Sequence, residues 1–203
     1  ALLRVRGPAT AVLRGERVAV NVAAHASGVA TATDAAVAAA REVDDNIRVA
    51  ATRKTTPGLR GVEKRAVAAA GGDTHRLDLS HMVMVKDNHV AELGLTEAIE
   101  RFRERASFAT NVEVEVEGPD AAARAAAAGA DVVLLDNMTP AETAAAVDRV
   151  RGRDADALTE ASGGITVETV PDYAATGVDV ISMGGLTHSA PALDLSFRTG
   201  GDG

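Results

Sequence analysis

Short apolar runs alternate with alanine-rich stretches along most of the chain, and this alternation predicts its secondary structure. Six runs rich in Val, Ile and Leu have the length and composition of buried strands. They are residues 47–51, 82–85, 112–116, 132–135, 158–161 and 178–182. The stretches between them have the character of helices, at residues 61–70, 96–106, 120–128, 140–150 and 167–175. The pattern is therefore a repeated strand-helix unit.

A longer alanine-rich segment with scattered Arg and Glu precedes these units. It extends from Gly15 to about Val43 and predicts a long helix, either whole or interrupted near Ser27 and Gly28. Residues 1–8 have the pattern of the middle of a strand, so we expect a further region ahead of them.

Strands that alternate with helices require right-handed crossovers and a parallel sheet, which is either an open doubly wound sheet or a barrel. The strand ends favour the barrel, because each one delivers polar or glycine residues to the edge where such barrels place their chemistry. These ends are Thr52-Arg53-Lys54, Lys86-Asp87-Asn88, Glu115-Val116-Glu117, Asp136-Asn137, Ser162-Gly163-Gly164 and Met183-Gly184-Gly185. The last two are rich in glycine, which suits phosphate binding by backbone N–H groups. We expect an α/β fold, a TIM-like barrel of six strands that is incomplete or open.

Charge and composition narrow the class of protein. The 203 residues carry 21 basic and 29 acidic side chains, a net charge of −8, which disfavours binding to nucleic acid or an anionic membrane by bulk electrostatics. No apolar run reaches the roughly 20 residues of a membrane span, and no targeting peptide is visible. The absence of cysteine excludes disulfides and thiolate sites. We expect a soluble cytoplasmic protein with one large core.

Basic residues are concentrated between positions 53 and 86. Seven basic and three acidic side chains give this segment a charge of +4, against −12 for the rest, and all three lysines of the chain lie in it. Such a segment on an acidic protein predicts recognition of selected carboxylates or phosphates. Arg60, Lys64 and Arg65 fit the solvated face of a helix. The basic residues that end apolar strands are Arg53, Lys54 and Lys86.

Carboxylates alternate with valines in one of the predicted strands. Glu113, Glu115 and Glu117 would point to the same side, and helices on the outer face make that side the barrel interior. With Asp136, they offer a carboxylate pair that could hold Mg²⁺ or ribose hydroxyls. Structural ion pairs across a narrow barrel are the alternative interpretation.

Other motifs are informative by presence or absence. His75 and His188 stand beside Arg76 and the Gly184-Gly185 pair, where they could donate to an anion, whereas no pair of histidines has zinc spacing. Ser162 lacks a Gly-x-Ser-x-Gly context and fits a phosphate donor better than a nucleophile. No Walker loop or Gly-x-Gly-x-x-Gly occurs, which argues against ordinary ATP and dinucleotide sites.

Taken together, the motifs resemble the quinolinate phosphoribosyltransferase family, from about Gly15 to Arg198. The N-terminal motifs are Gly15-Glu16-Arg17, Ser27-Gly28-Val29-Ala30-Thr31, Thr52-Arg53-Lys54-Thr55-Thr56-Pro57-Gly58-Leu59-Arg60, Glu63-Lys64 and His75-Arg76-Leu77. The others are Lys86-Asp87-Asn88-His89, Glu113-Val114-Glu115-Val116, Leu135-Asp136-Asn137-Met138, Glu160-Ala161-Ser162-Gly163-Gly164-Ile165, Leu186-Thr187-His188-Ser189 and Pro191-Ala192-Leu193-Asp194. The Thr-Arg-Lys-Thr-Thr-Pro-Gly run is the most specific of them.

The resemblance implies transfer of a phosphoribosyl group from PRPP to quinolinate, with loss of CO₂ and pyrophosphate, giving nicotinate mononucleotide for NAD synthesis. It also implies Mg²⁺ as cofactor and a homodimer or higher oligomer. Residues 1–45 would be the remnant of an N-terminal sandwich domain, residues 46–190 the catalytic barrel, and residues 191–203 a C-terminal tail.

The resemblance also implies roles for individual residues. The side chains expected to grip the quinolinate carboxylates are Arg53, His75, Arg76 and Lys86. Arg17 would enter the same site from a partner subunit. Lys54 would lie between the two substrates, while Glu115 and Asp136 would meet the ribose and its Mg²⁺; these three are the expected catalytic residues. Phosphate and other substrate contacts are implied at Thr52, Ser162, Gly163, Gly164, Met183, Gly184, Gly185 and His188.

Three alternatives remain open at this stage. Lys54 or Lys86 at a strand end could form the Schiff base of an aldolase. The barrel could be a non-catalytic sensor of phosphate or nucleotide, or it could belong to the molybdenum-transport-associated paralogue. The presence of both Arg53 and Arg76 argues for a dicarboxylate substrate.

Overall fold

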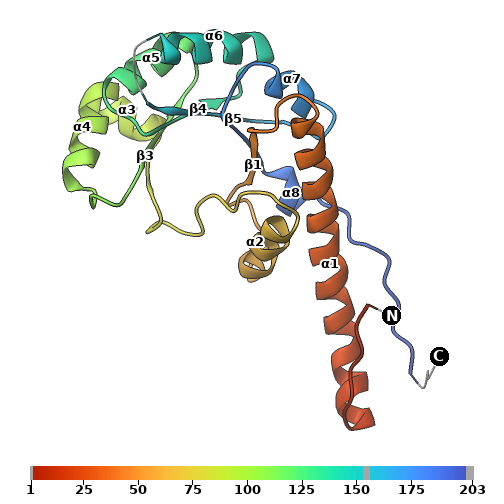
Figure 1. The fold of residues 1–203 in the computed structure, drawn as a ribbon. Helices are drawn as coiled ribbons and strands as arrows, with labels where there is room; N and C mark the ends of the chain where they lie inside the picture. Colours follow the sequence, from red (N-terminus) through yellow and green to blue (C-terminus); the bar gives the residue numbers. More distant parts are fainter. Residues whose placement is uncertain (1, 153–155, 200–203) are drawn as a thin grey trace.

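The computed structural model describes residues 2–152 and 156–199, and its centre is one sheet of six parallel strands (Figure 1). The strands are β1 (Arg48–Ala51), β2 (Val83–Val85), β3 (Val112–Val116), β4 (Val132–Asp136), β5 (Leu158–Ser162) and β6 (Val180–Met183). Their order is β1-β6-β5-β4-β3-β2, which is the order of strands around a barrel opened between β1 and β2. The predicted α/β fold with six parallel strands is confirmed.

At the opening between the edge strands β1 and β2, one residue, Asp73, bonds to the free edge of β1. Within the described residues, β1 and β2 do not pair with each other. Instead, the Asp73 N–H donates to the Val49 carbonyl (2.7 Å), and the Asp73 carbonyl accepts from the Ala51 N–H (2.9 Å). The chain then crosses to β2 through irregular residues 74–82. We call this opening the seam.

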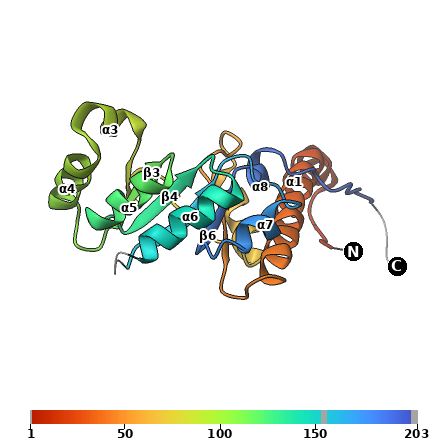
Figure 2. The same cartoon turned by 90° about the horizontal axis from the view of Figure 1, so that it is seen from above.

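Helices cover the outer face of the curved sheet, as the view from above shows (Figure 2). Those packed on β2 to β6 are α4 (Leu95–Arg105), α5 (Pro119–Ala127), α6 (Pro140–Arg151) and α7 (Val170–Ala174). Near β1, α2 (Arg60–Ala69) packs against α1 (Ala9–Arg41). None of the helices in the described part of the chain combines the length and apolar character needed to cross a membrane.

The helix α1 is a single helix of 33 residues, so the predicted interruption near Ser27 and Gly28 is wrong. A Cβ on Gly28 would lie 2.1 Å from the Pro191 carbonyl oxygen. The glycine therefore allows a close crossing of the C-terminal segment rather than a break. The strand predicted ahead of α1 is also absent from residues 2–8, which have no neighbouring strand to pair with. Residues 200–203 of the predicted tail lie outside the described residues.

Two short helices escaped prediction. They are α3 (Asp87–Leu93), directly after Lys86, and α8 (Gly185–His188), directly after Gly184. At the start of α3, the His89 ring accepts a hydrogen bond from the Lys86 N–H (3.0 Å). This local cap turns a strand end at once into a helix.

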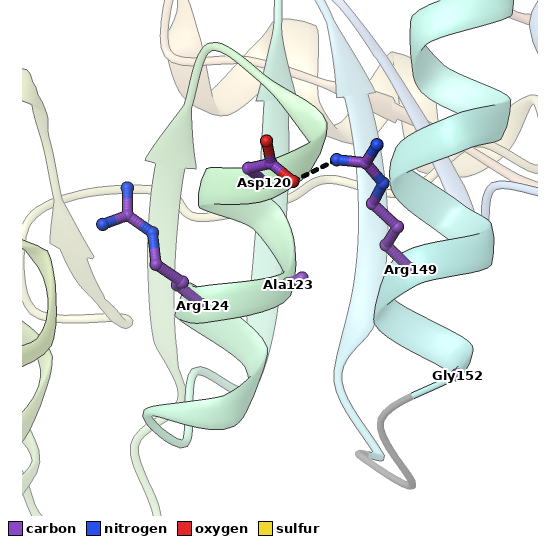
Figure 3. A pocket seen from close by; sticks show the side chains of 5 residues that line it. All are labelled: Asp120, Ala123, Arg124, Arg149 and Gly152. Carbon is purple, nitrogen blue, oxygen red and sulfur yellow. Dashed lines mark hydrogen bonds and ion pairs between the residues drawn. The ribbon is translucent and has the colours of Figure 1, made fainter.

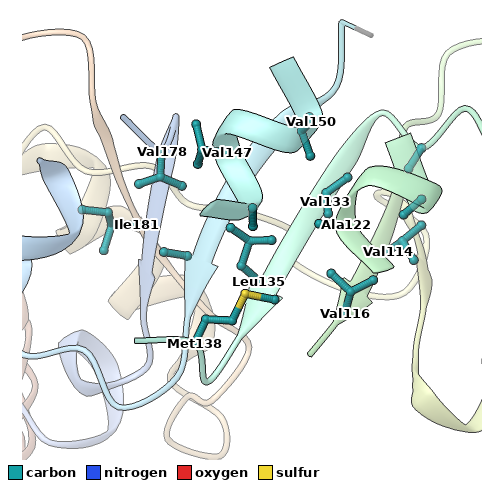
Figure 4. Packing of buried hydrophobic residues seen from close by; sticks show 14 of the residues in the cluster. Val114, Val116, Ala122, Val133, Leu135, Met138, Val147, Val150, Val178 and Ile181 are labelled. Atoms are coloured by element: carbon teal, nitrogen blue, oxygen red, sulfur yellow. The ribbon is translucent and has the colours of Figure 1, made fainter. Parts of the chain in front are cut away.

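The outer face of the sheet forms the apolar core. Val114, Leu135 and Ile181 are at most 1% exposed, and they pack with helix residues such as Ala122 and Val147 (Figure 4). Alternation along each strand sends the intervening residues to the inner face.

The inner face carries charge. The register places Glu115 beside Leu134, and Leu134 beside Glu160. Glu113 and Glu160 are 0% and 3% exposed, whereas Glu117 lies beyond the end of β3 and is exposed. The predicted interior side of β3 thus holds two carboxylates rather than three.

Candidate active site

The carboxyl edge of the sheet, which we call the rim, gathers polar residues from all six strands. The predicted site residues at or just beyond the strand ends are Thr52, Arg53, Lys54, Lys86, Glu115, Asp136, Ser162, Gly163, Gly164, Gly184, Gly185 and His188. Thr52 and His188 are 136 positions apart in the sequence, and the parallel sheet brings the whole set to one edge.

The two strands at the β1 side of the rim are tied together through their loops. The Thr187 hydroxyl donates to the Lys54 carbonyl (2.7 Å). A Cβ on Gly184 would lie 3.1 Å from both the Lys54 Cδ and the His188 Nε2. Glycine at this position therefore leaves room for both side chains, and Lys54 and His188 themselves are exposed.

A group of opposite charges occupies the other side of the rim. Lys86 Nζ lies 2.5 Å from Glu115 Oε2. Burial and the nearby Glu115 carboxylate both raise the pKa of Asp136, and its Oδ2 accepts from the Asn137 side-chain amide (2.7 Å). Two carboxylates close enough to repel each other form a place where an added cation would be stabilised.

The rim between β4 and β5 has a strained backbone. Asn137 has a φ of 55°, and its N–H donates to the Ser162 carbonyl (2.8 Å). Gly163 follows with a φ of 104°, and a Cβ there would lie 2.3 Å from the Asn137 side-chain oxygen. Only glycine fits this position, which keeps the backbone open beside Asp136.

Two arginines form an unpaired cationic site at the inner side of the rim and seam. Arg76 is 8% exposed, and its pKa is lowered by burial and by the positive charge of Arg53. Among the described residues, neither guanidinium forms an ion pair with a carboxylate. Two cations held close together without a partner anion predispose the site to bind one.

His75, in contrast, is fully occupied by the protein. Its Nε2 lies 3.2 Å from Glu160 Oε2 and 3.4 Å from Glu113 Oε1, while its Nδ1 accepts from the Arg76 N–H (2.7 Å). Burial acts to lower the pKa of His75, but interaction with the two carboxylates raises it to about 10. The resemblance implied that His75 grips a substrate carboxylate; in this structure both ring nitrogens already have protein partners.

Helix α2 holds the two loops that carry Arg53 and Arg76. The buried Glu63 carboxylate accepts from the Thr56 N–H (3.2 Å) and lies 2.7 Å from His25 Nε2 on α1. The next residue, Lys64, donates to the Thr74 carbonyl beside His75. Lys64 is 2% exposed, so its prediction as a solvated helix charge is wrong. The sequence contains the Glu63-Lys64 motif, but it does not indicate which loops these two side chains contact.

Two predicted residues have side chains that lie away from the rim. Arg17 is exposed on the N-terminal half of α1, which extends away from the sheet (Figure 1). Met183 is 3% exposed, and its side chain packs in the apolar core. A substrate contact at Met183 stays a prediction, and with the side chain in the core it would be made by the backbone.

Hollows on the surface do not all belong to the site. One of about 310 Å³ lies at the seam and is lined in part by His75, Arg76 and Asn111. Another of about 530 Å³ lies between α5 and α6, where Arg149 pairs with Asp120 and Arg124 points away from this pair (Figure 3). The latter is on the outer helices, and none of the predicted site residues lines it.

Comparisons with known proteins agree on one family. The model of the family described as "Quinolinate phosphoribosyl transferase, C-terminal domain" matches residues 29–198. The probable nicotinate-nucleotide pyrophosphorylase [carboxylating] of Methanothermobacter thermautotrophicus is 48% identical over 203 residues, covering 98% of this chain and 73% of that protein. The human nicotinate-nucleotide pyrophosphorylase [carboxylating] is 49% identical over 195 residues, covering 96% of this chain and 66% of that protein.

Solved structures give the same result. The crystal structure of NadC from Streptococcus pyogenes superposes with a TM-score of 0.86 at 44% identity, covering 95% of this chain and 66% of that chain. A NadC deletion mutant matches with a TM-score of 0.85 at 45% identity, covering 93% of this chain and 65% of that chain. This chain thus spans about two thirds of the length of the solved structures that it matches.

Proposed function

Because the chain belongs to the quinolinate phosphoribosyltransferase family, we propose that it catalyses phosphoribosyl transfer from PRPP to quinolinate in NAD biosynthesis. The pyridine nitrogen forms a bond to the anomeric carbon of the ribose as pyrophosphate leaves. The positive charge of the quaternised nitrogen stabilises the electron pair that stays on the adjacent ring carbon when its carboxylate departs as CO₂. That carbon then takes up a proton, and nicotinate mononucleotide is formed.

The observation that carries this proposal is the pair of unpaired guanidinium groups. Arg53 and Arg76 lie close enough for Arg53 to lower the pKa of Arg76, and neither has a carboxylate partner among the described residues. Quinolinate carries two adjacent carboxylates, and Arg binds a carboxylate through two parallel hydrogen bonds. A dianion would therefore relieve the repulsion between the two arginines. Lys86 adds positive charge for the quinolinate carboxylates, and Lys54 at the β1 end adds positive charge between the two substrates.

The other half of the rim suits the ribose and its developing charge. Glu115 and Asp136 supply negative charge where the anomeric carbon becomes cationic, and their positions are fixed before substrate binds. On the β5 and β6 sides, Ser162, Gly163, Gly184 and Gly185 offer accessible backbone and a hydroxyl for phosphate oxygens. The proposed mechanism needs no covalent intermediate with the protein, since positioning and electrostatics supply the acceleration.

We propose Mg²⁺ as the cofactor, bound through PRPP at Glu115 and Asp136. The donor set fits this ion, because carboxylate oxygens are its preferred protein ligands and the pKa of Asp136 is raised in part by the Glu115 charge. When bound, the ion would neutralise charge on the departing pyrophosphate. The chain's own residues orient the ribose and hold both substrates.

A homodimer with Arg17 reaching the partner's site stays a prediction from the sequence, as does a cytoplasmic location. The exposure of Arg17 on a projecting helix is compatible with a role outside its own subunit.

The test is formation of nicotinate mononucleotide by the complete protein supplied with quinolinate, PRPP and Mg²⁺. We expect CO₂ and pyrophosphate in equal amounts with the nucleotide. An intact protein that binds PRPP tightly by calorimetry yet forms no product would favour a sensor and overturn the proposal. A borohydride-stable adduct at Lys54 or Lys86 with a carbonyl substrate would instead favour an aldolase.

A further inference from the structure

Three side chains meet inside the sheet at a position that the proposed reaction does not explain. His75 lies between Glu113 of β3 and Glu160 of β5, and one ligand atom from each lies within 4.8 Å of the others. Both carboxylates are at least nine-tenths buried. We call His75, Glu113 and Glu160 the interior triad.

Buried carboxylates without partners are costly, and this cluster contains several such oxygens. Both oxygens of Glu113 and Oε1 of Glu160 have no hydrogen-bond donor in the described part of the chain. Because His75 Nδ1 accepts the Arg76 N–H, the ring proton lies on Nε2, which faces the two carboxylates. The cation nearby is the Arg76 guanidinium, whose charge both glutamates attract, and an attracting charge lowers the cost of keeping carboxylates buried.

The backbone of His75 is strained as well. Its φ is 50°, and with Asn137 it is one of two non-glycine residues at positive φ in the described chain. Such a conformation is energetically unfavourable and persists only when surrounding contacts enforce it. Here the His75 N–H donates to Asp73 Oδ1 (2.9 Å), and the Thr74 hydroxyl donates to the His75 carbonyl (3.2 Å).

This geometry determines where the next residue lies. The Arg76 N–H donates to His75 Nδ1 (2.7 Å), so the ring that the glutamates hold by Nε2 also holds the Arg76 backbone by Nδ1. Two further contacts hold the same segment. The Asp73 carboxylate accepts from the His75 N–H, and Lys64 of α2 donates to the Thr74 carbonyl. The segment crosses the seam, where no regular strand pairing supports it among the described residues.

We propose that Glu113 and Glu160 are positioning residues for quinolinate binding: they hold the His75 ring, and through it they set Arg76 opposite Arg53. This inference rests on the proposed function and assigns to His75 a role in positioning rather than direct contact with substrate. The carboxylates repel a dianionic substrate, so their benefit is the placement of the cations.

The test uses Glu113→Gln and Glu160→Gln in the complete protein, because both changes keep the shape and remove the charge. We expect the KM for quinolinate to rise about 10-fold in each, the size expected when the His75 ring loses one charged partner, with the KM for PRPP within about 2-fold. The matched control is Glu100→Gln, an exposed position on α4, which should leave both constants unchanged.

A second measurement does not depend on turnover. In protein labelled with ¹⁵N-histidine, NMR titration should show the pKa of His75, about 10 in the parent, falling in each variant. Quinolinate should shift the His75 ring signals only slightly, because its nitrogens keep their protein partners. If the parent forms no nicotinate mononucleotide while the His75 titration behaves as expected, the proposed function fails and the interior triad stands.

Three results would overturn the proposal. One is an unchanged KM for quinolinate in both Gln variants. Another is a large change of the His75 ring signals on adding quinolinate, which would mean direct contact. The third is a metal ion bound in stoichiometric amount to the purified parent and lost from Glu113→Gln, since the same three atoms could then be ligands. If a Gln variant does not fold, His75→Asn replaces it, because Asn tolerates the left-handed conformation, and its KM for quinolinate should rise as well.

Discussion

Leu135 and Asp136 are neighbours in β4, yet they belong to two faces of the sheet that differ in almost every respect. The Leu135 side chain is 1% exposed in an apolar core beneath the helices. Asp136 lies at the rim, with a pKa raised by burial and by Glu115. The outer face is held by many similar contacts, each replaceable by another of the same volume. The inner face is held by a few individual charges, none replaceable.

The outer face should therefore determine mainly the stability of the fold, and the inner face mainly catalysis and binding. A change on the outer face should alter the free energy of unfolding while the folded molecules stay active. A change on the inner face should alter catalysis or binding while the fold persists. The predictions below test that separation, in order of expected effect.

The largest effect is expected for Asp136→Ala. Removing a carboxylate beside the developing cation should lower kcat roughly 100- to 1,000-fold, a loss typical for one electrostatic group in an active site, and leave the KM for quinolinate within about 3-fold. Steady-state kinetics with both substrates measure this. Asp148→Ala, exposed on α6, serves as control, and a kcat within about 10-fold of the parent would contradict the assignment.

Next is Leu135→Ala on the opposite face. It should lower the free energy of unfolding by about 3 kcal/mol through lost burial and a residual cavity, with kcat per folded molecule unchanged. Urea unfolding followed by circular dichroism measures the stability. Leu158→Ala, whose parent side chain is 42% exposed, should cost less than about 1 kcal/mol. Equal losses at the two positions would remove the distinction between the faces.

Arg76→Ala should have a smaller effect, confined to one substrate. The KM for quinolinate should rise roughly 10- to 100-fold, as expected for loss of a charge-assisted hydrogen bond, while the KM for PRPP changes less than about 3-fold. Arg65→Ala, exposed on α2, should match the parent. A similar rise in KM for both substrates would mean that Arg76 does not specifically bind the carboxylates of quinolinate.

The smallest net effect is expected for the dependence of stability on pH, because two buried groups, His75 and Lys64, contribute with opposite signs. The pKa of His75 is raised from 6.5 to about 10, so its contribution to stability is complete below pH 6.5 and is lost as the pH rises through about 10. The pKa of Lys64 is lowered from 10.5 to about 8, chiefly by burial and then by Arg60. Because the unfolded chain then binds a proton that the folded chain lacks, its contribution rises from about pH 8 to 10.5.

These two trends can be separated by difference. Unfolding free energies are measured across the pH range for the parent, His75→Asn and Lys64→Met. The parent minus His75→Asn should fall with pH between 6.5 and about 10, and the parent minus Lys64→Met should rise between about 8 and 10.5. A slope of the reverse sign for His75 would contradict its interaction with Glu113 and Glu160, and a slope of the reverse sign for Lys64 would contradict the effect of its burial.

The sequence predicted the outer face well, because its signal is repetition. All six strands and the longer helices follow from apolar periodicity, and β3 (Val112–Val116) has the predicted bounds. The rim followed from the residues that come directly after each strand, and the β3 pattern placed Glu113 and Glu115 inside. Motif resemblance, rather than periodicity, supplied the substrate, and the division into residues 1–45, 46–190 and 191–203 stays a prediction.

What the sequence left out depends on contacts between distant segments. In the sequence, Glu160 is only part of a motif, because nothing in its local pattern indicates a contact with His75, 85 positions earlier. Lys64 has the pattern of a surface lysine, and only the loop over α2 buries it. The local sequence predicts a break at Gly28, because the segment that packs against this glycine, at Pro191, lies at the far end of the chain.

The pairing of β1 with β6 also has a consequence for how the chain assembles. β1 finds its ladder partner about 130 residues later, with Arg48 beside Val180, whereas each pair from β2 to β6 joins neighbours in sequence. Closing so long a loop is entropically unfavourable until much of the chain is ordered. On a ribosome, β1 and the Arg53-Lys54 end of the rim would wait for β6 to emerge. Of the six strands of this sheet, the first to be made would be the last to join it.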